Sequence, residues 1–571
     1  MSPDGGAASR HQTLRDLAWL LGAGILLMAP GLGLKDPWPP DEPRYVLVAS
    51  EMLASGDWLV PVRAGEIYPD KPPVFFWIEA LLLALTGSIR LAHQLPSLLA
   101  SLLTLALTYD LGRRLWNRRV GLWAGGVLAV TVQLVMQARS GQIDATLAVM
   151  VLLGLYGLLR HALLGPAFRW YLIGWAAVGL GIVTKGVGFL PLLVLLPLAW
   201  AHGRDWRHLG PRPDRRWWLG VPVMLLVIAG WLVPLLTRVA TRDDPRLEAY
   251  VGEILFRQTA TRYAGSWMHV RPVWYYLVEV VPWLWLPATL ALPWLVPAWR
   301  ARLARRDARY LVLLGWLALV LLFFSLSPGK RGVYVLPALP AFALVAAPLA
   351  PGLWRSRRLQ HLGFVATSLL AVALTAAVIA VVAQPGVAEL GSNPEVRAVR
   401  APLIAAAGLS IVCLALAGPR KGLAALVGLF AGGWTILGLW VYPVLDPYRS
   451  GRGLMQAAES HLGPGEQLAI VDWREQMMLQ ATRPVHHFGF RTPTERDNRL
   501  ALGWLQEDPR RQLLIPHGRL TPCFSIGHRE PVFTDHESRW YLLDGTSLTG
   551  RCQPLAGPVY EYAPRSARRA E

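Results

Sequence analysis

Ionisable side chains able to move protons or bind anions stand close together in two short stretches near the start of this chain. Asp41 and Glu42 lie in DPWPPDEPRY together with Arg44, and Asp70 precedes Lys71 in YPDKPP. A carboxylate can accept a proton from a hydroxyl nucleophile, and a lysine or arginine can stabilise negative charge on phosphate oxygens. These residue types predict group-transfer chemistry at a phosphate, provided that the fold brings them together.

The composition predicts that a membrane surrounds this chemistry. Of the 571 residues, 54% are hydrophobic and 16% are charged, and the mean hydropathy is +0.36. Many apolar runs reach about 18 residues, the length that crosses a hydrocarbon core. We therefore expect an all-α polytopic membrane protein. The net charge of +19 indicates membrane topology and not nucleic-acid binding, because arginine clusters between spans mark cytoplasmic loops.

The apolar runs predict about 13 transmembrane helices. The run 73–88 is excluded because it is short, begins beside two prolines and carries Glu79, which suits a helix lying in the interface. All basic loops are then cytoplasmic, with the N-terminus inside and the tail outside. The alternative is a hairpin of 73–88 with 94–111, which places one basic loop on the wrong side. The predicted spans are 17–34, 94–111, 119–137, 142–161, 170–183, 187–202, 217–237, 273–297, 310–326, 332–350, 361–383, 401–418 and 422–442.

The polar parts of the chain divide into a first loop and a tail. Residues 1–446 form the predicted transmembrane domain, whose first run lacks a clear cleavage site and is expected to be a retained anchor. Residues 35–93 form its first outer loop. Residues 447–571 are expected to fold as a small soluble α/β domain, because QLAIVD, RQLLIP and RWYLLDG are typical of short strands. Cys523 and Cys552 are an even pair that permits a disulfide in an oxidising compartment.

On this topology the loops of the outer face collect polar residues from distant parts of the sequence. Asp144 begins an apolar run, where a charge costs roughly 2.5–3.5 kcal/mol at full depth and less near the interface. That cost indicates a partner or a function. Each of the others, taken singly, is equally well explained as a solvated loop charge or a span end that reaches water. They are Arg139, Lys185, Arg257, Arg262, His269, Arg271, Lys330, Arg331 and Tyr334.

Five stretches in order carry a family resemblance. DEPRYVLVASEML, YPDKPPVFFW, ARSGQIDATLA, TKG and SLSPGKRGVYVLPALP resemble the signature stretches of the membrane glycosyltransferases that include protein O-mannosyltransferases and aminoarabinose lipid A transferases. The resemblance covers roughly residues 15–350. It implies the GT-C fold, a polyprenyl-phosphate-linked sugar donor, and a multi-pass protein of the bacterial inner membrane whose active site and tail are periplasmic.

The resemblance also implies roles for individual residues. Asp41 matches the acidic residue of the family's first loop and Asp144 that of its second outer loop, so both are expected to be catalytic. Asp70 stands where aminoarabinose transferases usually have a glutamate that may join a histidine on a metal, and His269 is its candidate partner. Two ligands are too few for a closed zinc site, so a divalent metal is compatible but not required. The expected donor phosphate-binding residues are Lys71, Arg44, Arg257, Arg271 and Tyr334.

The sequence leaves the acceptor and one other class of function open. If the acceptor is a hydroxyl, Asp41 can act as general base and the anomeric centre inverts. If the acceptor is a phosphate, as on lipid A, Asp41 orients groups or contacts an amino sugar. Lipid A or another envelope lipid is favoured over a protein acceptor. A transporter of lipid-linked sugars is the alternative to an enzyme, but it would place charges near mid-membrane in repeated halves, and this chain shows no repeat.

Overall fold

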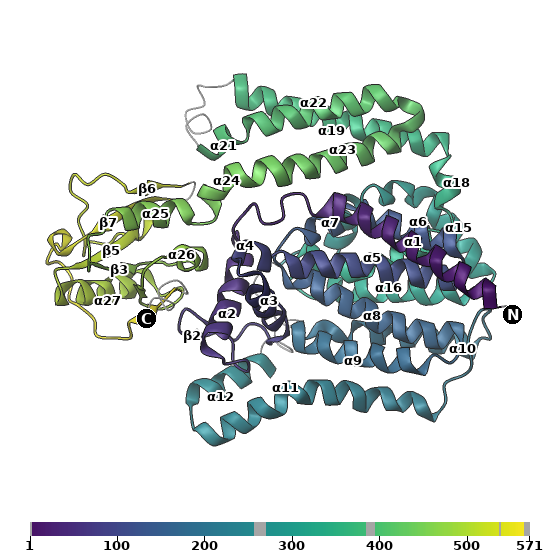
Figure 1. Cartoon of the computed structure of the whole chain (residues 1–571), viewed down its shortest axis with the longest axis horizontal. Helices are drawn as coiled ribbons and strands as arrows, with labels where there is room; N and C mark the ends of the chain where they lie inside the picture. Colours follow the sequence, from purple (N-terminus) through teal and green to yellow (C-terminus); the bar gives the residue numbers. More distant parts are fainter. Residues whose placement is uncertain (1–2, 256–269, 384–393, 536–537, 565–571) are drawn as a thin grey trace.

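Long apolar helices, packed side by side, make up most of the computed structural model (Figure 1). It describes residues 3–255, 270–383, 394–535 and 538–564. In that part of the chain seven helices are long and apolar enough to cross a membrane, and two bent helix pairs raise the number to nine. The seven contain α5 (Leu95–Leu115), α8 (Ile143–Leu164), α11 (Gly220–Arg242), α16 (Ala308–Leu326), α19 (Arg357–Ala383), α22 (Arg400–Ala417) and α23 (Gly422–Ile436).

The remaining predicted spans also lie on helical segments. Among them, α1 (Pro3–Met28) is a helix of 26 residues and α9 (Phe168–Lys185) is a helix of 18. Shorter apolar helices cover Val187–Gly203 and Gly332–Ala346. The chain is therefore a mostly helical multi-pass membrane protein, and its exact number of spans stays a prediction.

The two bent helix pairs lie against each other. One bends by 67° between α6 (Arg118–Ala129) and α7 (Val132–Ala138), and the other by 109° between Tyr276–Leu284 and Ala288–Ala304. At the bends the backbone N–H of Val132 donates to the carbonyl of Leu286 over 3.1 Å. A break in a helix at membrane depth is tolerated when protein groups form hydrogen bonds with the backbone groups that lose their helical partners. The bond from Val132 to Leu286 provides such a partner.

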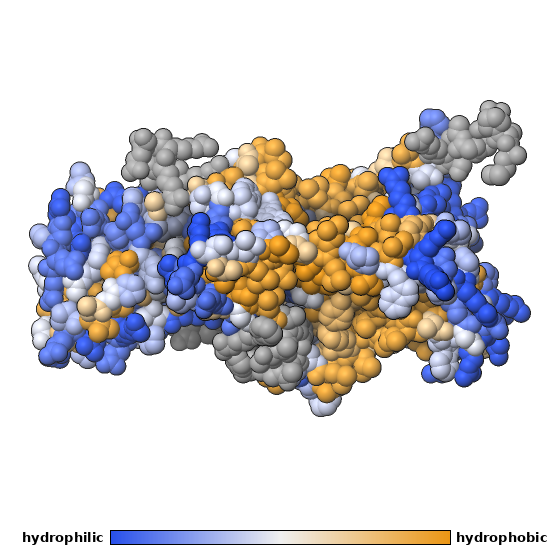
Figure 2. All heavy atoms as spheres, turned by 90° about the horizontal axis from the view of Figure 1, so that it is seen from below, coloured by the Kyte–Doolittle hydropathy of each residue, from blue (hydrophilic) through white to orange (hydrophobic). Residues whose placement is uncertain are grey.

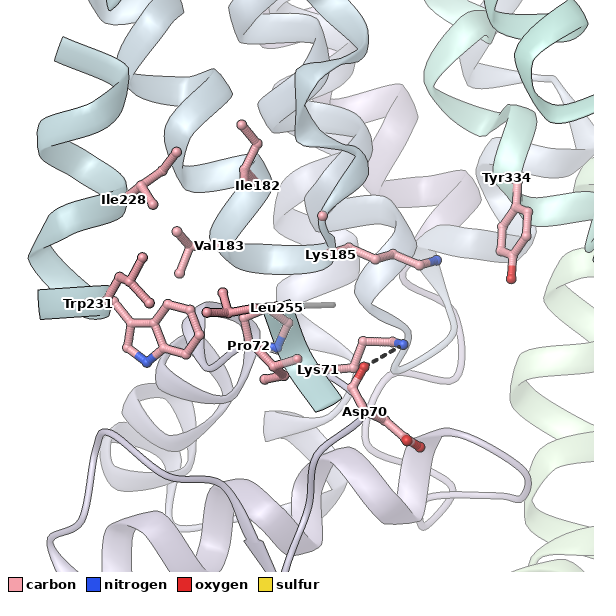
Figure 3. A pocket seen from close by; sticks show the side chains of 13 residues that line it. Asp70, Lys71, Pro72, Ile182, Val183, Lys185, Ile228, Trp231, Leu255 and Tyr334 are labelled. Atoms are coloured by element: carbon pink, nitrogen blue, oxygen red, sulfur yellow. Dashed lines mark hydrogen bonds between the residues drawn. The ribbon is translucent and has the colours of Figure 1, made fainter. Parts of the chain in front are cut away.

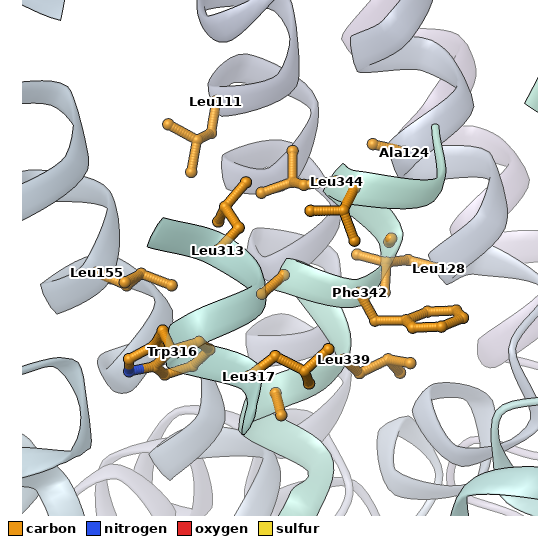
Figure 4. Packing of buried hydrophobic residues seen from close by; sticks show 14 of the residues in the cluster. Leu111, Ala124, Leu128, Leu155, Leu313, Trp316, Leu317, Leu339, Phe342 and Leu344 are labelled. Atoms are coloured by element: carbon orange, nitrogen blue, oxygen red, sulfur yellow. The ribbon is translucent and has the colours of Figure 1, made fainter. Parts of the chain in front are cut away.

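A continuous apolar core joins the central helices. Side chains from α5, α6, α8, α16 and α17 (Leu339–Ala346) interlock there, including Leu111, Ala124, Leu155, Trp316 and Phe342 (Figure 4). These five residues are buried, each with at most 2% of its surface exposed. The core fixes the helices whose ends carry the ionisable residues.

Glycines bring α8 and α9 into close contact. A side-chain carbon on Gly157 would lie 2.3 Å from the carbonyl oxygen of Trp170 and 2.8 Å from the Cα atom of Gly174. Small residues at such a crossing let two backbones approach closely, which is the usual packing of membrane helices. The start of α8 and the end of α9 are therefore held side by side, and these two ends carry Asp144 and Lys185.

The first loop folds into short elements at the end of the bundle that lies nearest the C-terminal sheet (Figure 1). Its elements are α2 (Glu42–Ser55), the hairpin β1 (Val62–Arg63) and β2 (Glu66–Ile67), α3 (Val74–Thr86) and α4 (Ile89–Ala92). With 13 residues, α3 is about 20 Å long at 1.5 Å per residue, which is too short to cross a core of roughly 30 Å. Its Glu79 is buried inside the protein.

Glu42, the neighbour of Asp41, has a structural role. Its carboxylate forms a buried ion pair with Lys35. It also accepts hydrogen bonds from the backbone N–H of Trp38 over 2.9 Å and from that of Gly141 over 3.0 Å. Glu42 therefore ties the start of α2 to the turn that precedes α8.

The tail contains a six-stranded sheet in the order β6-β7-β5-β3-β4-β8. β3, β4 and β5 are parallel, and the outer strands pair antiparallel. The three predicted strands are confirmed as β3, β5 and β7.

The elements of the tail are α24 (Tyr442–Arg449), α25 (Arg452–Ser460), β3 (Gln467–Ile470), α26 (Glu475–Gln480), β4 (Val485–His487), α27 (Thr494–Glu507), β5 (Arg511–Pro516), β6 (Phe533–Thr534), β7 (Arg539–Leu543) and β8 (Tyr560–Tyr562). The predicted domain boundary at residue 447 falls inside α24, because the last apolar helix continues without a break to Arg449.

The surface divides into an apolar band and two hydrophilic ends. Figure 2 shows hydrophobic residues over the middle of the molecule, with hydrophilic residues on the sheet at one end and on the opposite end of the helical bundle. The outlying helices α19 and α22 supply many of the exposed apolar side chains, such as Leu369, Val372, Ile379 and Leu416. A lipid bilayer around the middle would cover this band.

The disulfide between Cys523 and Cys552 closes a loop over 29 positions of the tail, as the even pair of cysteines permits. Cys413, half-buried in α22, is free. In denatured protein purified without reductant, we expect a thiol-reactive maleimide to label one cysteine per chain, and three after reduction. Mass spectrometry of the labelled protein counts them. Three labels before reduction would contradict the disulfide.

Candidate active site

An ion pair joins the start of α8 to the end of α9. Asp144 lies in the first turn of α8 and Lys185 is the last residue of α9, and their side chains form a salt bridge in which both are less than 10% exposed. The positive end of the α8 dipole favours a carboxylate there, and the negative end of the α9 dipole favours an ammonium group. Asp144 therefore has the partner that its position in an apolar run requires.

A second ion pair joins the first loop to the segment after α16. Asp41, which precedes α2, accepts a hydrogen bond on Oδ2 from Nη2 of Arg331 over 2.7 Å. Nη1 of Arg44 lies 3.8 Å from the other oxygen, Oδ1. Burial of Asp41 opposes its charged form, but the charge and hydrogen bond of Arg331, together with the charges of Arg44 and Lys185, hold the pKa of Asp41 below its ordinary value. Asp41 is therefore ionised at neutral pH.

The two ion pairs form one group, which we call the charge cluster: Asp41, Asp144, Lys185 and Arg331. The charge of Lys185 acts on Asp41, and the charge of Asp144 acts on Arg331. Nζ of Lys185 also lies 4.8 Å from the centre of the Tyr334 ring, within range of a cation–π contact. Two carboxylates and two cations from four distant segments thus meet at this end of the bundle.

A pocket of about 170 Å³ opens beside the charge cluster. Figure 3 shows the ammonium groups of Lys71 and Lys185 pointing to the same side of the pocket, toward Tyr334. Nζ of Lys71 donates to the backbone carbonyl of Asp70 over 2.9 Å. The rest of the lining is mostly apolar and comes from α9, α11 and neighbouring segments: Pro72, Ile182, Val183, Gly186, Ile228, Trp231, Leu232, Ile254 and Leu255.

The structure brings some of the predicted site residues together and leaves others apart. Lys71, Asp70 and Tyr334 line the pocket. Arg44 does not; its Nε donates to Oε1 of Glu475 in the tail over 2.8 Å. Arg271 is exposed, outside the pocket lining, with its guanidinium carbon 5.9 Å from the centre of the Tyr275 ring.

Two predicted residues lie outside the described part of the chain, and two unpredicted ones lie in the site. Arg257 and His269 are outside the described residues. Lys185 and Arg331 are expected from the sequence only as loop charges, although both stand in stretches that carry the family resemblance, TKG and SLSPGKRGVYVLPALP. Their spacing in the sequence gives no sign that they pair with Asp144 and Asp41, since each pair joins separate segments.

Among the described residues no group of three or more histidine, cysteine, aspartate or glutamate side chains could hold a metal ion. Asp70 is the described member of the predicted metal pair, and a single carboxylate is an incomplete ligand set. The metal site therefore stays a prediction, and no step of the chemistry below passes through it.

Sequence comparisons place the chain among sugar transferases. Residues 70–233 match the family described as dolichyl-phosphate-mannose-protein mannosyltransferase. An undecaprenyl phosphate-alpha-4-amino-4-deoxy-L-arabinose arabinosyl transferase of Pseudomonas aeruginosa strain LESB58 is 34% identical over 351 residues, which are 59% of this chain and 59% of that protein. The transferase of the same name from Pseudomonas savastanoi pv. phaseolicola is 30% identical over 66% of this chain and 69% of its own length. The match thus spans 59% of the length of the first of these relatives.

The fold is shared over nearly the whole chain with a solved structure. ArnT from Cupriavidus metallidurans bound to undecaprenyl phosphate has a TM-score of 0.72 and 24% identity, and the match covers 95% of this chain and 99% of that one. This likeness shows that the chain is a membrane protein of the GT-C fold. By its sequence, the chain belongs to the family of undecaprenyl phosphate-aminoarabinose arabinosyl transferases.

The pairing of Asp144 with Lys185 generates a stability prediction. Lys185→Met leaves the carboxylate of Asp144 buried without its partner, and we expect a loss of about 3–5 kcal/mol. The midpoint of thermal unfolding in detergent should fall accordingly. Adding Asp144→Asn removes the isolated charge and should restore most of the midpoint. A double variant as unstable as Lys185→Met would contradict the pairing.

Proposed function

We propose that this protein is a glycosyltransferase that moves a monosaccharide from a polyprenyl-phosphate donor to an acceptor in the cell envelope, with lipid A or another envelope lipid as the favoured acceptor. The observation that carries the proposal is the pocket beside the charge cluster, which has two lysines at one end and an apolar wall at the other. A lipid phosphate has the same two parts. The names of the relatives favour an amino-pentose as the sugar.

The pocket suits both ends of such a donor. Lys71 and Lys185 would bind the phosphate and stabilise the negative charge that develops on it as the bond to the sugar breaks. The side chains on α9 and α11, among them Val183, Ile228 and Trp231, would contact the first isoprene units. Transfer of the sugar to the acceptor would leave polyprenyl phosphate as the second product, bound at first to the same two lysines.

Asp41 is suited to act on the acceptor. In the proposed step the acceptor oxygen attacks the anomeric carbon as the bond from that carbon to the phosphate oxygen breaks. The electron pair of the breaking bond leaves with the polyprenyl phosphate. A hydroxyl acceptor gives its proton to the ionised Asp41 carboxylate, and the anomeric centre inverts. With a phosphate acceptor there is no proton to remove, and Asp41 would instead orient the acceptor or contact an amino group of the sugar.

Asp144 supports the donor side of this reaction. Its ion pair fixes the ammonium group of Lys185 at the pocket. A lysine held in this way loses little freedom when it binds a phosphate, which favours tight placement of the leaving group. We propose that Asp144 acts through Lys185, as a positioning residue.

The membrane arrangement that we propose has thirteen spans, with the charge cluster and the tail on the periplasmic side of the bacterial inner membrane. The basic loops of the sequence support this orientation. Residues 447–571 would form the periplasmic α/β domain, and the sheet of the tail with its helices supports that part of the proposal. The disulfide of the tail suits an oxidising compartment.

No cofactor enters the proposed reaction, because Lys71 and Lys185 supply the positive charge that the leaving phosphate needs. A divalent metal held by Asp70 and His269 stays compatible with the sequence. Loss of transfer in EDTA, with recovery on adding a divalent metal, would show that the metal is required.

A protein acceptor is the second candidate, because the matched family model describes protein mannosyltransferases. Transfer to a lipid and transfer to a protein use the same donor chemistry. They differ in the acceptor that binds near Asp41. A transporter of lipid-linked sugars would need no ionised base and releases its sugar still attached to the lipid. These three functions are separated by their products.

Asp41→Asn tests the catalytic proposal. The variant keeps the shape of the side chain but removes the negative charge. With a hydroxyl acceptor, whose proton Asp41 takes, we therefore expect transfer from undecaprenyl-phosphate aminoarabinose to fall by about 10²–10⁴-fold. Binding of undecaprenyl phosphate should be retained, because the lysines are unchanged. The measurement is the initial rate of transfer by purified protein in liposomes.

Asp57→Asn is the matched control for Asp41→Asn. Asp57 lies in the same first loop and pairs with Arg238 over 2.8 Å, away from the pocket lining. It should keep transfer within a few-fold of the unmodified protein. An undiminished rate for Asp41→Asn would exclude Asp41 as a catalytic residue.

The acceptor is identified by mass spectrometry of envelope molecules from cells with and without this protein. For a lipid acceptor we expect lipid A to gain the mass of a pentosamine only when the protein is present. Unchanged lipid A together with altered envelope glycoproteins would instead support the protein acceptor. Replacing Asp41 by Asn in the same cells should abolish whichever change is found.

A further inference from the structure

We propose that Glu475, from the C-terminal tail, is a positioning residue of the active site, which keeps Arg44 away from the oxygen of Asp41 that faces the acceptor. This inference rests on the proposed function of Asp41. It gives the tail an indirect part in catalysis, through Arg44 and Asp41, in addition to any contact with the acceptor.

The two oxygens of Asp41 are in different environments. Oδ2 is taken by the hydrogen bond from Arg331 over 2.7 Å. Oδ1 faces Nη1 of Arg44 at 3.8 Å, which is beyond hydrogen-bonding distance. Within the described chain no hydrogen bond reaches Oδ1, so this oxygen has lone pairs available for an incoming hydroxyl or amino group.

Glu475 holds the other edge of the same guanidinium. Nε of Arg44 donates to Oε1 of Glu475 over 2.8 Å, and the side chain of Glu475 is only 7% exposed. Arginine otherwise prefers to bind a carboxylate with two parallel hydrogen bonds. The contact with Glu475 turns one edge of Arg44 away from Asp41, and the two carboxylates share a single cation.

Arg63 strengthens this arrangement. Its Nη1 lies 3.4 Å from the same Oε1 of Glu475, and its guanidinium carbon lies 3.5 Å from the centre of the Phe490 ring in the tail. Two arginines thus converge on one carboxylate oxygen. Without the charge of Glu475 these like charges would repel each other, and Arg44 has Asp41 as the nearest remaining carboxylate.

Separate contacts attach the tail that carries Glu475 to the first loop and the segment before it. Glu66 of the first-loop hairpin accepts a hydrogen bond from the backbone N–H of Phe490 over 2.9 Å, and the ring of His487 bonds the backbone carbonyl of Ala64 over 2.8 Å. Arg452, at the start of α25, pairs with Asp36. The tail is therefore attached to the first loop at several points, and among the described residues the ion pair through Glu475 is the one that reaches Arg44.

Glu475→Gln tests the proposal, because it keeps the shape of the side chain and removes its charge. Arg44 should then close on Oδ1 of Asp41 and block it. We calculate kcat from the concentration of protein that binds the donor, and we expect this kcat to fall about tenfold. The KM for the donor should not change, since Lys71 and Lys185 are untouched. Glu475→Asp, which restores the charge, should recover part of the lost kcat.

A double-mutant cycle separates positioning from a structural role. In an Arg44→Gln background Glu475→Gln has no arginine to release, so we expect it to change kcat less than twofold. The matched control is Glu66→Ala, which removes a tail contact of similar size without touching Arg44. It should lower the unfolding midpoint but leave kcat per donor-binding molecule within twofold.

The possible outcomes are distinct. A fall in kcat that disappears in the Arg44→Gln background supports the proposal. Equal effects of Glu475→Gln in both backgrounds, or equal loss of kcat in Glu66→Ala, would overturn it while the proposed function stands. Absence of transfer by the unmodified protein would overturn the proposed function, and this inference with it.

Discussion

Buried charge beside a membrane is the constraint on which the rest of this structure depends. A carboxylate that stays ionised away from water needs a partner, and at this site the partners come from other segments: Asp144 with Lys185, and Asp41 with Arg331. Each pair joins elements that are distant in the sequence. The pairs therefore satisfy the carboxylates and, at the same time, bring four segments to one end of the bundle.

The packing of the bundle makes that arrangement precise. The close crossing of α8 and α9 at Gly157 and Gly174 holds the two helices against each other, and the ion pair joins their ends at Asp144 and Lys185. Glu42 bonds the turn before α8 to the start of α2, directly after Asp41. A rigid frame of this kind holds charged groups ready for a reaction without reorganisation, which is how enzymes gain most from electrostatics.

The sequence predicts the helical framework well and the pairing within the site poorly. Apolar runs predict α8, α16 or α19 because the length that crosses a bilayer is a local property of the chain. Asp41, Lys71 and Tyr334 stand out as polar residues in the stretches that carry the family resemblance. By contrast, the pairing of Arg44 with Glu475 joins positions 431 residues apart, and no periodicity or local propensity carries information about it. The role of Arg331 was missed for the same reason.

The central claim is that one pocket binds the donor phosphate between Lys71 and Lys185, beside an ionised Asp41. The most direct measurement is a cryo-electron microscopy structure of the protein in lipid nanodiscs with undecaprenyl phosphate. The account predicts phosphate density in contact with both ammonium groups, with the isoprenoid chain along α9 and α11. Phosphate density at another end of the bundle, with this pocket empty, would contradict it.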